Sequence, residues 1–254
     1  MTRTDARSWS LREAEGGAAY VAPHPEPEDA NVWFFTRLGG VSEPPYDSLN
    51  VSTKVEDTEE AVSENLARIR RAMGGNETAW VRQIASDRVF RVDAAGLAGE
   101  GDALVTSGNG FSLVVAVADC VPVALVSPDE VSMVHSGWRG TLSGISGNAV
   151  AEMSSQPGNV TAYIGPSIRR CCYEVSEEIA ASFEERFGEG VADGRYISLQ
   201  EAIRRNLEEA GVGDIHDLGI CTGCRSDLFY SHRKEKPATG RTLAAVARAP
   251  RKEP

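Results

Sequence analysis

Three strongly apolar runs follow one another in the centre of the chain, with only short polar stretches between them. They cover residues 112–118, 121–126 and 131–135. Runs of this length that are rich in valine predict β-strands. Clustered strands without a helix between each pair favour mixed sheets over a doubly wound parallel sheet. The sequence therefore predicts an α+β fold with mixed sheets.

The rest of the chain alternates between shorter strand patterns and amphipathic helix patterns. Further strands are predicted at residues 32–37, 79–84, 89–92, 103–105, 160–164, 215–220, 228–231 and 242–247, and helices at 57–73, 141–153, 176–187 and 198–210. Asp57, Ser176 and Ser198 are the expected helix caps. Residues 1–18 are expected to be a loose arm or an edge segment, and residues 19–254 a single domain.

The spacing of two reactive side chains around one turn is the main clue to function. Residues 127–130 (Ser-Pro-Asp-Glu) predict a turn between the second and third central strands. If the turn is centred between Pro128 and Asp129, the residue that faces His135 is Pro122. Cys120 then lies two positions further along on the same face, at a diagonal distance of roughly 7–8 Å. A shift of the turn by half a residue would put Cys120 on the opposite face.

A thiol and an imidazole on one face are suited to zinc binding or to nucleophile–base chemistry. The alternative for Cys120 is a small buried apolar residue. Arg139 follows His135 in a Gly-Trp-Arg-Gly segment, and a guanidinium binds phosphate or an oxyanion in a fixed fork geometry. The alternative for Arg139 is a surface salt bridge. These residues make a candidate catalytic group.

The other four cysteines form two pairs, Cys171-Cys172 and Cys221-Thr222-Gly223-Cys224. A structural zinc ion needs four ligands, which the two pairs could supply. Adjacent cysteines are expected to diverge, so reduced and packed thiols are favoured over a zinc cluster. An odd number of cysteines in a chain of this length also favours a reducing cytoplasm over a disulfide framework.

Charge and hydropathy exclude several classes of partner. The formal net charge is −11, which would repel a nucleic-acid backbone or an anionic membrane surface. No apolar run approaches the ~20 residues needed to cross a bilayer. Residues 1–17 lack the apolar centre of a signal peptide. We therefore expect a cytoplasmic protein that binds neither nucleic acid nor membrane.

Several motifs, taken together and in order, identify a family. The chain resembles the laccase-domain or polyphenol oxidoreductase proteins, a family also named for purine nucleoside phosphorylase activity and as peptidoglycan editing factors. The resemblance covers about residues 30–247 and is carried by residues 36–42, 46–50, 118–120, 135–140, 164–168, 172–175, 221–222, 231–233 and 239–241.

The resemblance implies a fold, a metal and a set of reactions. The fold is a four-layer α/β/β/α arrangement, shared distantly with the deamidating cytotoxic necrotising factor. The metal is zinc held by His, Cys and His. The reactions are phosphorolysis of adenosine, inosine, guanosine or methylthioadenosine, and hydrolytic deamination of adenosine. The substrates would be a purine nucleoside and phosphate.

One metal ligand of the family is missing from this chain. The cysteine and the second histidine of the family fall on Cys120 and His135. The first histidine lies in a Gln-Val-His-Gly motif, and the equivalent residues here are Gln83-Ile84-Ala85-Ser86. Since Ala85 has no ligand atom, we expect weak or absent zinc and impaired turnover. Copper is not expected, because five cysteines and four histidines provide no multi-copper ligand set.

Three functional hypotheses follow. In the first, a zinc-dependent phosphorylase and deaminase uses Cys120, His135 and Arg139. Arg37 or Arg233 would help to hold phosphate, Asn50 and Gln83 would orient the sugar or base, and His232 would line the pocket.

In the second hypothesis, Cys120 is a thiolate nucleophile and His135 its base, in a hydrolase or amidase that acts on cell-wall precursors. In the third, the protein is a nucleoside-binding homologue without catalysis.

Overall fold

The structure is a computed structural model that describes residues 8–249. The strands are β1 (Trp9–Glu13), β2 (Ala19–Pro23), β3 (Ala30–Phe35), β4 (Glu77–Arg82), β5 (Val89–Arg91), β6 (Gly96–Glu100), β7 (Ala103–Thr106), β8 (Phe111–Val117), β9 (Val121–Val126), β10 (Val131–Ser136), β11 (Thr161–Ile164), β12 (Ala192–Asp193), β13 (Tyr196–Ile197), β14 (Asp214–Asp217) and β15 (Thr242–Arg248). The helices are α1 (Glu59–Ala72), α2 (Trp138–Leu142), α3 (Ile145–Glu152), α4 (Glu177–Phe187), α5 (Leu199–Glu209) and α6 (His232–Glu235), with one 3₁₀ turn, η1 (Pro157–Asn159).

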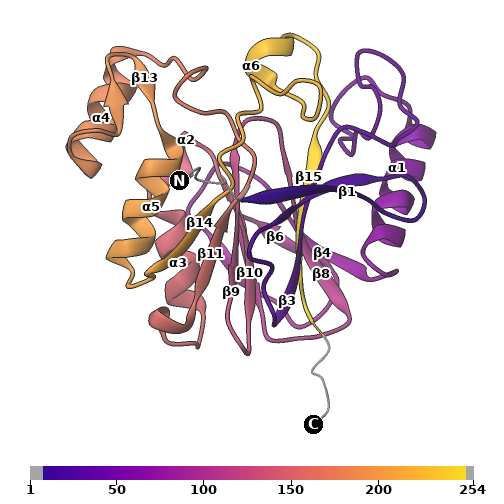
Figure 1. Cartoon of the computed structure of the whole chain (residues 1–254), viewed down its shortest axis with the longest axis horizontal. Helices are drawn as coiled ribbons and strands as arrows, with labels where there is room; N and C mark the ends of the chain where they lie inside the picture. Colours follow the sequence, from indigo (N-terminus) through magenta and orange to yellow (C-terminus); the bar gives the residue numbers. More distant parts are fainter. Residues whose placement is uncertain (1–7, 250–254) are drawn as a thin grey trace, which may run out of the picture.

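Two mixed sheets form the centre of the molecule (Figure 1). The first has the order β1-β2-β3-β15-β8-β4-β6, and the second has the order β14-β11-β9-β10-β7-β5. In the first sheet β4 pairs in parallel with β6 and β8, and in the second β11 pairs in parallel with β14 and β5 with β7. The predicted mixed-sheet fold is confirmed.

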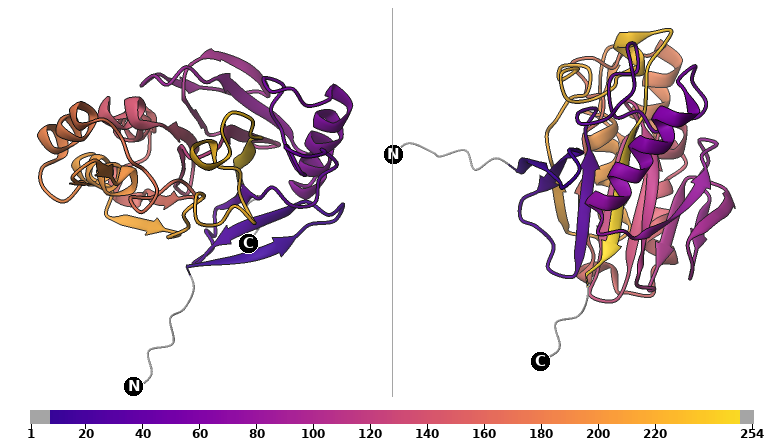
Figure 2. Two further views of the ribbon diagram at one scale, coloured as in Figure 1. Left: turned by 90° about the horizontal axis from the view of Figure 1, so that it is seen from above. Right: turned by 90° about the vertical axis from the view of Figure 1, so that its right-hand side faces the viewer.

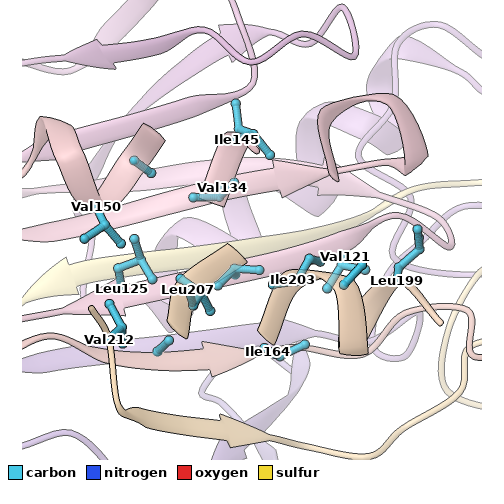
Figure 3. Close-up of a cluster of buried hydrophobic side chains, with 14 of the residues drawn as sticks. Val121, Leu125, Val134, Ile145, Val150, Ile164, Leu199, Ile203, Leu207 and Val212 are labelled. Carbon is cyan, nitrogen blue, oxygen red and sulfur yellow. The ribbon is translucent and has the colours of Figure 1, made fainter. Parts of the chain in front are cut away.

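Three apolar clusters separate four layers. One lies between α1 and the first sheet and includes Phe35 and Ile69. A second lies between the two sheets and includes Phe34 and Met133. The third packs α3, α4 and α5 against the second sheet and is shown in Figure 3. Figure 2 shows α1 on one side of the sheets and α3, α4 and α5 on the other. The expected α/β/β/α arrangement of one domain is therefore present.

The predicted register between the two central strands is confirmed. His135 of β10 pairs with Pro122 of β9. Ala124 and Val126 of β9 pack in the cluster between the sheets, whereas Leu125 packs toward the helices. Because side chains alternate along a strand, Cys120 and His135 both face the space between the sheets. Both faces of β9 are covered, which explains why its apolar run is continuous.

Two predicted elements differ from the structure. The helix predicted at 141–153 is two helices, α2 and α3, separated by Gly144, which has a φ of 78°. Glycine adopts this left-handed conformation without steric cost, so the chain turns there. The strand predicted at 228–231 is a buried turn in which the N–H groups of Leu228 and Phe229 donate to the Arg225 carbonyl. An apolar run alone cannot distinguish a strand from such a segment.

Other sequence expectations concern the ends of elements. α1 is capped by Thr58, not Asp57, because the Thr58 hydroxyl accepts from the Ala61 N–H. Ser176 and Ser198 cap α4 and α5 as predicted. The described part of the expected loose arm forms β1, an edge strand paired with β2; residues 1–7 lie outside the described residues.

Within residues 8–249 there is no helix with the length and apolar character that crossing a bilayer requires.

Candidate active site

Cys120 and His135 meet at the end of the second sheet, where they line a groove of about 1070 Å³. Cys120 directly precedes β9, and His135 lies near the end of β10. The backbone of Gly137 approaches the sulfur closely, since a Cβ atom added there would lie 3.2 Å from Cys120 Sγ. A larger residue at position 137 would therefore push the thiol away from its place beside the ring.

The His135 ring is held by a buried carboxylate that the sequence analysis did not identify. Asp102, which directly precedes β7, is fully buried, and its Oδ1 lies 2.8 Å from His135 Nδ1. Its Oδ2 accepts from the backbone N–H and the hydroxyl of Ser86, at 2.6 and 2.7 Å. Because an ionised carboxylate only accepts hydrogen bonds, Nδ1 carries a proton. The other ring nitrogen is then available to Cys120 or to a ligand.

Electrostatics link the three side chains. Burial raises the pKa of Asp102, but the hydrogen bonds from His135 and Ser86 outweigh this and lower it to about 2. Burial lowers the pKa of His135, but the electrostatic interaction with Cys120 and the hydrogen bonds with Asp102 and Cys120 raise it to about 9. The result is a Cys–His–Asp chain in which His135 is protonated at neutral pH.

These shifts predict how stability depends on pH. The pKa of His135 is raised from 6.5 to about 9, so its stabilisation is fully present below pH 6.5 and is lost as the pH rises through 9. The pKa of Asp102 is lowered from 3.8 to about 2, so its stabilisation is present above pH 3.8 and is lost as the pH falls through 2. We expect the unfolding free energy of the unsubstituted chain to exceed that of His135→Gln most between pH 3.8 and 6.5. Urea titrations across this range test the prediction, and a difference that does not change with pH would contradict it.

Ala85 lies at the same carboxylate. Its N–H donates to Asp102 Oδ1 at 3.0 Å, the oxygen that also bonds His135. Its φ is 59°, a left-handed conformation in which histidine occurs several times more often than most side chains. Position 85 therefore lies at the carboxylate that holds His135, in a backbone conformation that histidine tolerates.

The residues present do not fit a catalytic zinc site. Such a site uses three protein ligands and an open position. In the part of the chain that the structure describes, Cys120 and His135 belong to no group of three or more potential metal ligands. Ala85 provides no donor atom. We therefore base no reaction step on a metal at this position.

Two further predicted site residues line the groove. Gln83 uses its side-chain amide to pair with the backbone of Ala116 in both directions, at 2.9 and 3.0 Å. It thereby extends the contact between β4 and β8. His232 begins α6 and is exposed toward the groove. Burial and the neighbouring positive charge of Arg241 lower its pKa, so neutral His232 can accept a hydrogen bond from a ligand.

Two of the predicted arginines do not line the groove, and each has a partner elsewhere. Arg139 is exposed, and its guanidinium lies 4.4 Å from the Trp138 ring centre. Arg37 is largely buried and forms ion pairs with Asp47 and Glu235. The ion pairs of Arg37 join the loop that holds Asp47 to α6, and neither arginine belongs to the lining of the groove that contains Cys120.

Arg233 and Asn50 also act within the protein. The Arg233 guanidinium donates to the Glu174 carbonyl and lies over the Tyr173 ring. Asn50 is fully buried, and its Oδ1 accepts from the backbone N–H of Arg241 at 2.9 Å. Asn50 therefore positions the segment that carries Arg241 and does not itself line the groove.

Arg241 is the second functional candidate that sequence reasoning missed. It lines the groove, and its Nη1 donates to the carbonyls of Thr239 and Gly240. Within residues 8–249 no carboxylate forms an ion pair with it. Burial lowers the pKa of Arg241, while the charges of Cys120 and Asp119 raise it. A guanidinium without a carboxylate partner beside Cys120 is suited to hold an anion.

Comparisons with known proteins agree with this architecture. The sequence model of the family described as multi-copper polyphenol oxidoreductase laccase matches residues 31–249. A purine nucleoside phosphorylase of Deinococcus radiodurans is 38% identical over 87% of this chain and 89% of its own length. Purine nucleoside phosphorylase YfiH of Escherichia coli is 31% identical over 89% and 97%.

The fold comparison gives the same relationship. The crystal structure of YlmD from Geobacillus stearothermophilus superposes with a TM-score of 0.86 at 30% identity, over 96% of this chain and 100% of that one. The Neisseria meningitidis protein NMB0706 gives a TM-score of 0.82 at 28% identity. Since the family model and these relatives cover most of the sequence, the chain belongs to the multi-copper polyphenol oxidoreductase laccase family.

Proposed function

We propose that this chain catalyses the phosphorolysis of purine nucleosides at the Cys120–His135 end of the groove. The relatives named purine nucleoside phosphorylase align with most of its length. The groove, about 1070 Å³, is large enough for a nucleoside and phosphate together. The observation that carries the proposal is that His135, protonated and held by Asp102, lines the same groove as Arg241, a guanidinium with no carboxylate partner among residues 8–249.

The reaction needs an anion site and an acid. A phosphate oxygen forms a bond to C1′ of the ribose while the bond from C1′ to the purine nitrogen breaks. The purine leaves with the electron pair of that bond and takes up a proton. Arg241 binds the phosphate and directs it at the sugar.

His135 donates the proton to the departing purine through its Nε2. The hydrogen bond from Nδ1 to Asp102 fixes the orientation of the ring. The interaction with Cys120 helps to raise the pKa of the ring. As a thiolate that lines the groove, Cys120 stabilises positive charge that develops on the sugar. Deamination of adenosine requires an activated water, and Cys120 and His135 alone are two donors where a catalytic zinc has three. We therefore propose that this chain deaminates adenosine weakly or not at all.

The direct test is a product analysis of inosine, guanosine, adenosine and methylthioadenosine with the purified protein. Phosphorolysis yields the free base and the sugar 1-phosphate in equal amounts, and only when phosphate is present. Release of free ribose at a rate independent of phosphate would instead show hydrolysis and would contradict the proposal.

Arg241→Met tests the anion site. Hydrogen bonds to charged groups contribute about 1.5–3 kcal/mol, so we expect the KM for phosphate to rise by about 10- to 100-fold, with a smaller change in the KM for the nucleoside. Arg225→Gln is the matched control, because Arg225 is a partly exposed arginine that is paired with Asp227 and does not line the groove. An unchanged KM for phosphate in Arg241→Met would place the anion elsewhere.

The Cys120–His135–Asp102 order also favours a second candidate function, a thiol hydrolase or amidase. A nucleophile, a base and a carboxylate that orients the base are the parts of such a site. In this reaction Cys120 attacks a carbonyl carbon and the amine leaves with a proton from His135. Mass spectrometry of chelator-treated protein tests this function. An acyl group trapped on Cys120 with a cell-wall precursor amide would support it, and its absence together with phosphate-dependent turnover would exclude it.

A further inference from the structure

The four remaining cysteines come together where the segment after β11 meets the segment after β14. The Sγ atoms of Cys171, Cys172, Cys221 and Cys224 all lie within 4.8 Å of one another. The expectation that adjacent Cys171 and Cys172 diverge is therefore wrong. The turn from Arg169 to Cys172, closed by a 2.8 Å hydrogen bond from the Cys172 N–H to the Arg169 carbonyl, brings both thiols to one side.

The distances between the sulfur atoms match a tetrahedral metal site. Cys171 Sγ lies 3.5 Å from Cys221 Sγ and 3.6 Å from Cys224 Sγ. Cys172 Sγ lies 3.5 Å from Cys224 Sγ and 3.8 Å from Cys171 Sγ. Four thiolates around zinc, each at about 2.3 Å, have sulfur atoms about 3.8 Å apart. A disulfide would need about 2.05 Å, and all four cysteines are free.

The backbone around the cluster is built to keep the two pairs together. Ser167, which follows β11, forms a parallel bridge with Cys221, which follows β14. The N–H groups of Cys224 and Arg225 both donate to the Cys221 carbonyl, which gives the Cys-x-x-Cys segment the tight turn of a metal knuckle. Gly223 leaves the space for the facing thiol, since an added Cβ would lie 3.2 Å from Cys172 Sγ.

A tetrathiolate zinc centre carries two negative charges, and nearby cations can offset them. The Arg169 guanidinium is held by Asp217 in a bidentate pair at 2.8 Å. Arg169 lies two residues before Cys171, and its carbonyl accepts the hydrogen bond that closes the turn to Cys172. The guanidinium therefore belongs to the segment that carries two of the four cysteines.

We propose that Cys171, Cys172, Cys221 and Cys224 bind one Zn²⁺ as a closed structural site. Four thiolates in a tetrahedron leave no open position, so this ion takes no part in catalysis. It fastens the segment after β11 to the segment after β14. Thr222, next to ligand Cys221, donates to Asp119 at 2.6 Å, and Asp119 precedes Cys120. The zinc ion would thereby hold one side of the groove in place.

The test separates this ion from any metal near Cys120. Zinc is measured by elemental analysis in Cys120→Ser protein and in Cys120→Ser with Cys224→Ser or Cys172→Ser, all purified with a reductant and reconstituted with Zn²⁺. We expect about one zinc per chain in the first protein and a loss of at least about ten-fold in the other two. Equal zinc content in all three, or none in the first, would overturn the proposal.

A second readout uses the full chain and does not depend on whether the variants fold. Co²⁺ added to the metal-free protein should give the intense thiolate-to-cobalt and ligand-field bands of a tetrahedral sulfur site. Added Zn²⁺ should abolish these bands, and a chelator should lower the melting temperature of the zinc-loaded chain. Weak octahedral cobalt spectra, or oxidation of the cysteines to disulfides under the same reducing conditions, would refute a zinc site.

Discussion

Cys120→Ser is expected to lower the kcat of phosphorolysis by about 10²–10⁴-fold, the range that a group participating in acid catalysis contributes. Serine removes the interaction with the Cys120 sulfur that helps to raise the pKa of His135 and leaves the Asp102 hydrogen bond in place. The rate–pH profile should therefore change as well as the rate. Its limb that reports the protonated form of His135 should move to lower pH. Steady-state kinetics from pH 5 to 10 measure both effects.

A charge-conserving variant distinguishes the two candidate functions at Cys120. Cys120→Asp retains a negative charge beside the ring but has no nucleophilic sulfur. If Cys120 acts through its charge, the kcat of Cys120→Asp should be at least about ten-fold higher than that of Cys120→Ser. The rate–pH profile should also return toward that of the unsubstituted chain. If Cys120 is a nucleophile, both variants should be equally inactive. Full activity in Cys120→Ser would show that the reaction takes place elsewhere in the groove.

Ala85→His is expected to raise both the zinc content and the turnover of the protein, whereas Cys120→Ser lowers turnover. The N–H of residue 85 shares a carboxylate oxygen with His135, and the φ of 59° is one that histidine tolerates. An imidazole there would be the third donor beside Cys120 and His135. We expect zinc content to rise by about one ion per chain. We expect turnover to rise by about 10²-fold or more, since a metal at the reacting atoms supplies several kcal/mol.

Ala85→Asn is the matched control for this gain. Asparagine also adopts the left-handed conformation, so the variant tests the backbone and the bulk of a side chain without an imidazole. Zinc content and turnover should stay at the level of the unsubstituted chain. Metal content and activity that remain unchanged in Ala85→His would count against the assignment of position 85 to the site.

Local patterns in the sequence were sufficient to predict the part of the site that lies on neighbouring strands. β9 and β10 follow from two apolar runs, and the four-residue turn between them sets the pairing of His135 with Pro122. Since side chains alternate along strands, this pairing was enough to put Cys120 and His135 on one face. The caps at Ser176 and Ser198 are equally local, because a cap bonds an N–H three residues away.

Contacts between segments that are far apart in the chain could not be predicted from such local patterns. Asp102 is 33 residues from His135 in the chain, and no periodicity links them. Arg241 reaches the groove because β15 pairs with β8 in the first sheet, while Cys120 belongs to the second. The four cysteines converge because the segments after β11 and β14 run side by side, a pairing that joins positions about 50 residues apart.

What this sequence determined by itself is therefore the set of elements, the hairpin register and the facing pair of a thiol and an imidazole. The tertiary structure decided which groups surround that pair: the carboxylate that accepts the hydrogen bond from the ring, the Arg241 guanidinium and the four-sulfur cluster. The physical reason is that hydrogen bonding and side-chain alternation act over a few residues. The stacking of two sheets is instead decided by burial of apolar surface over the whole chain.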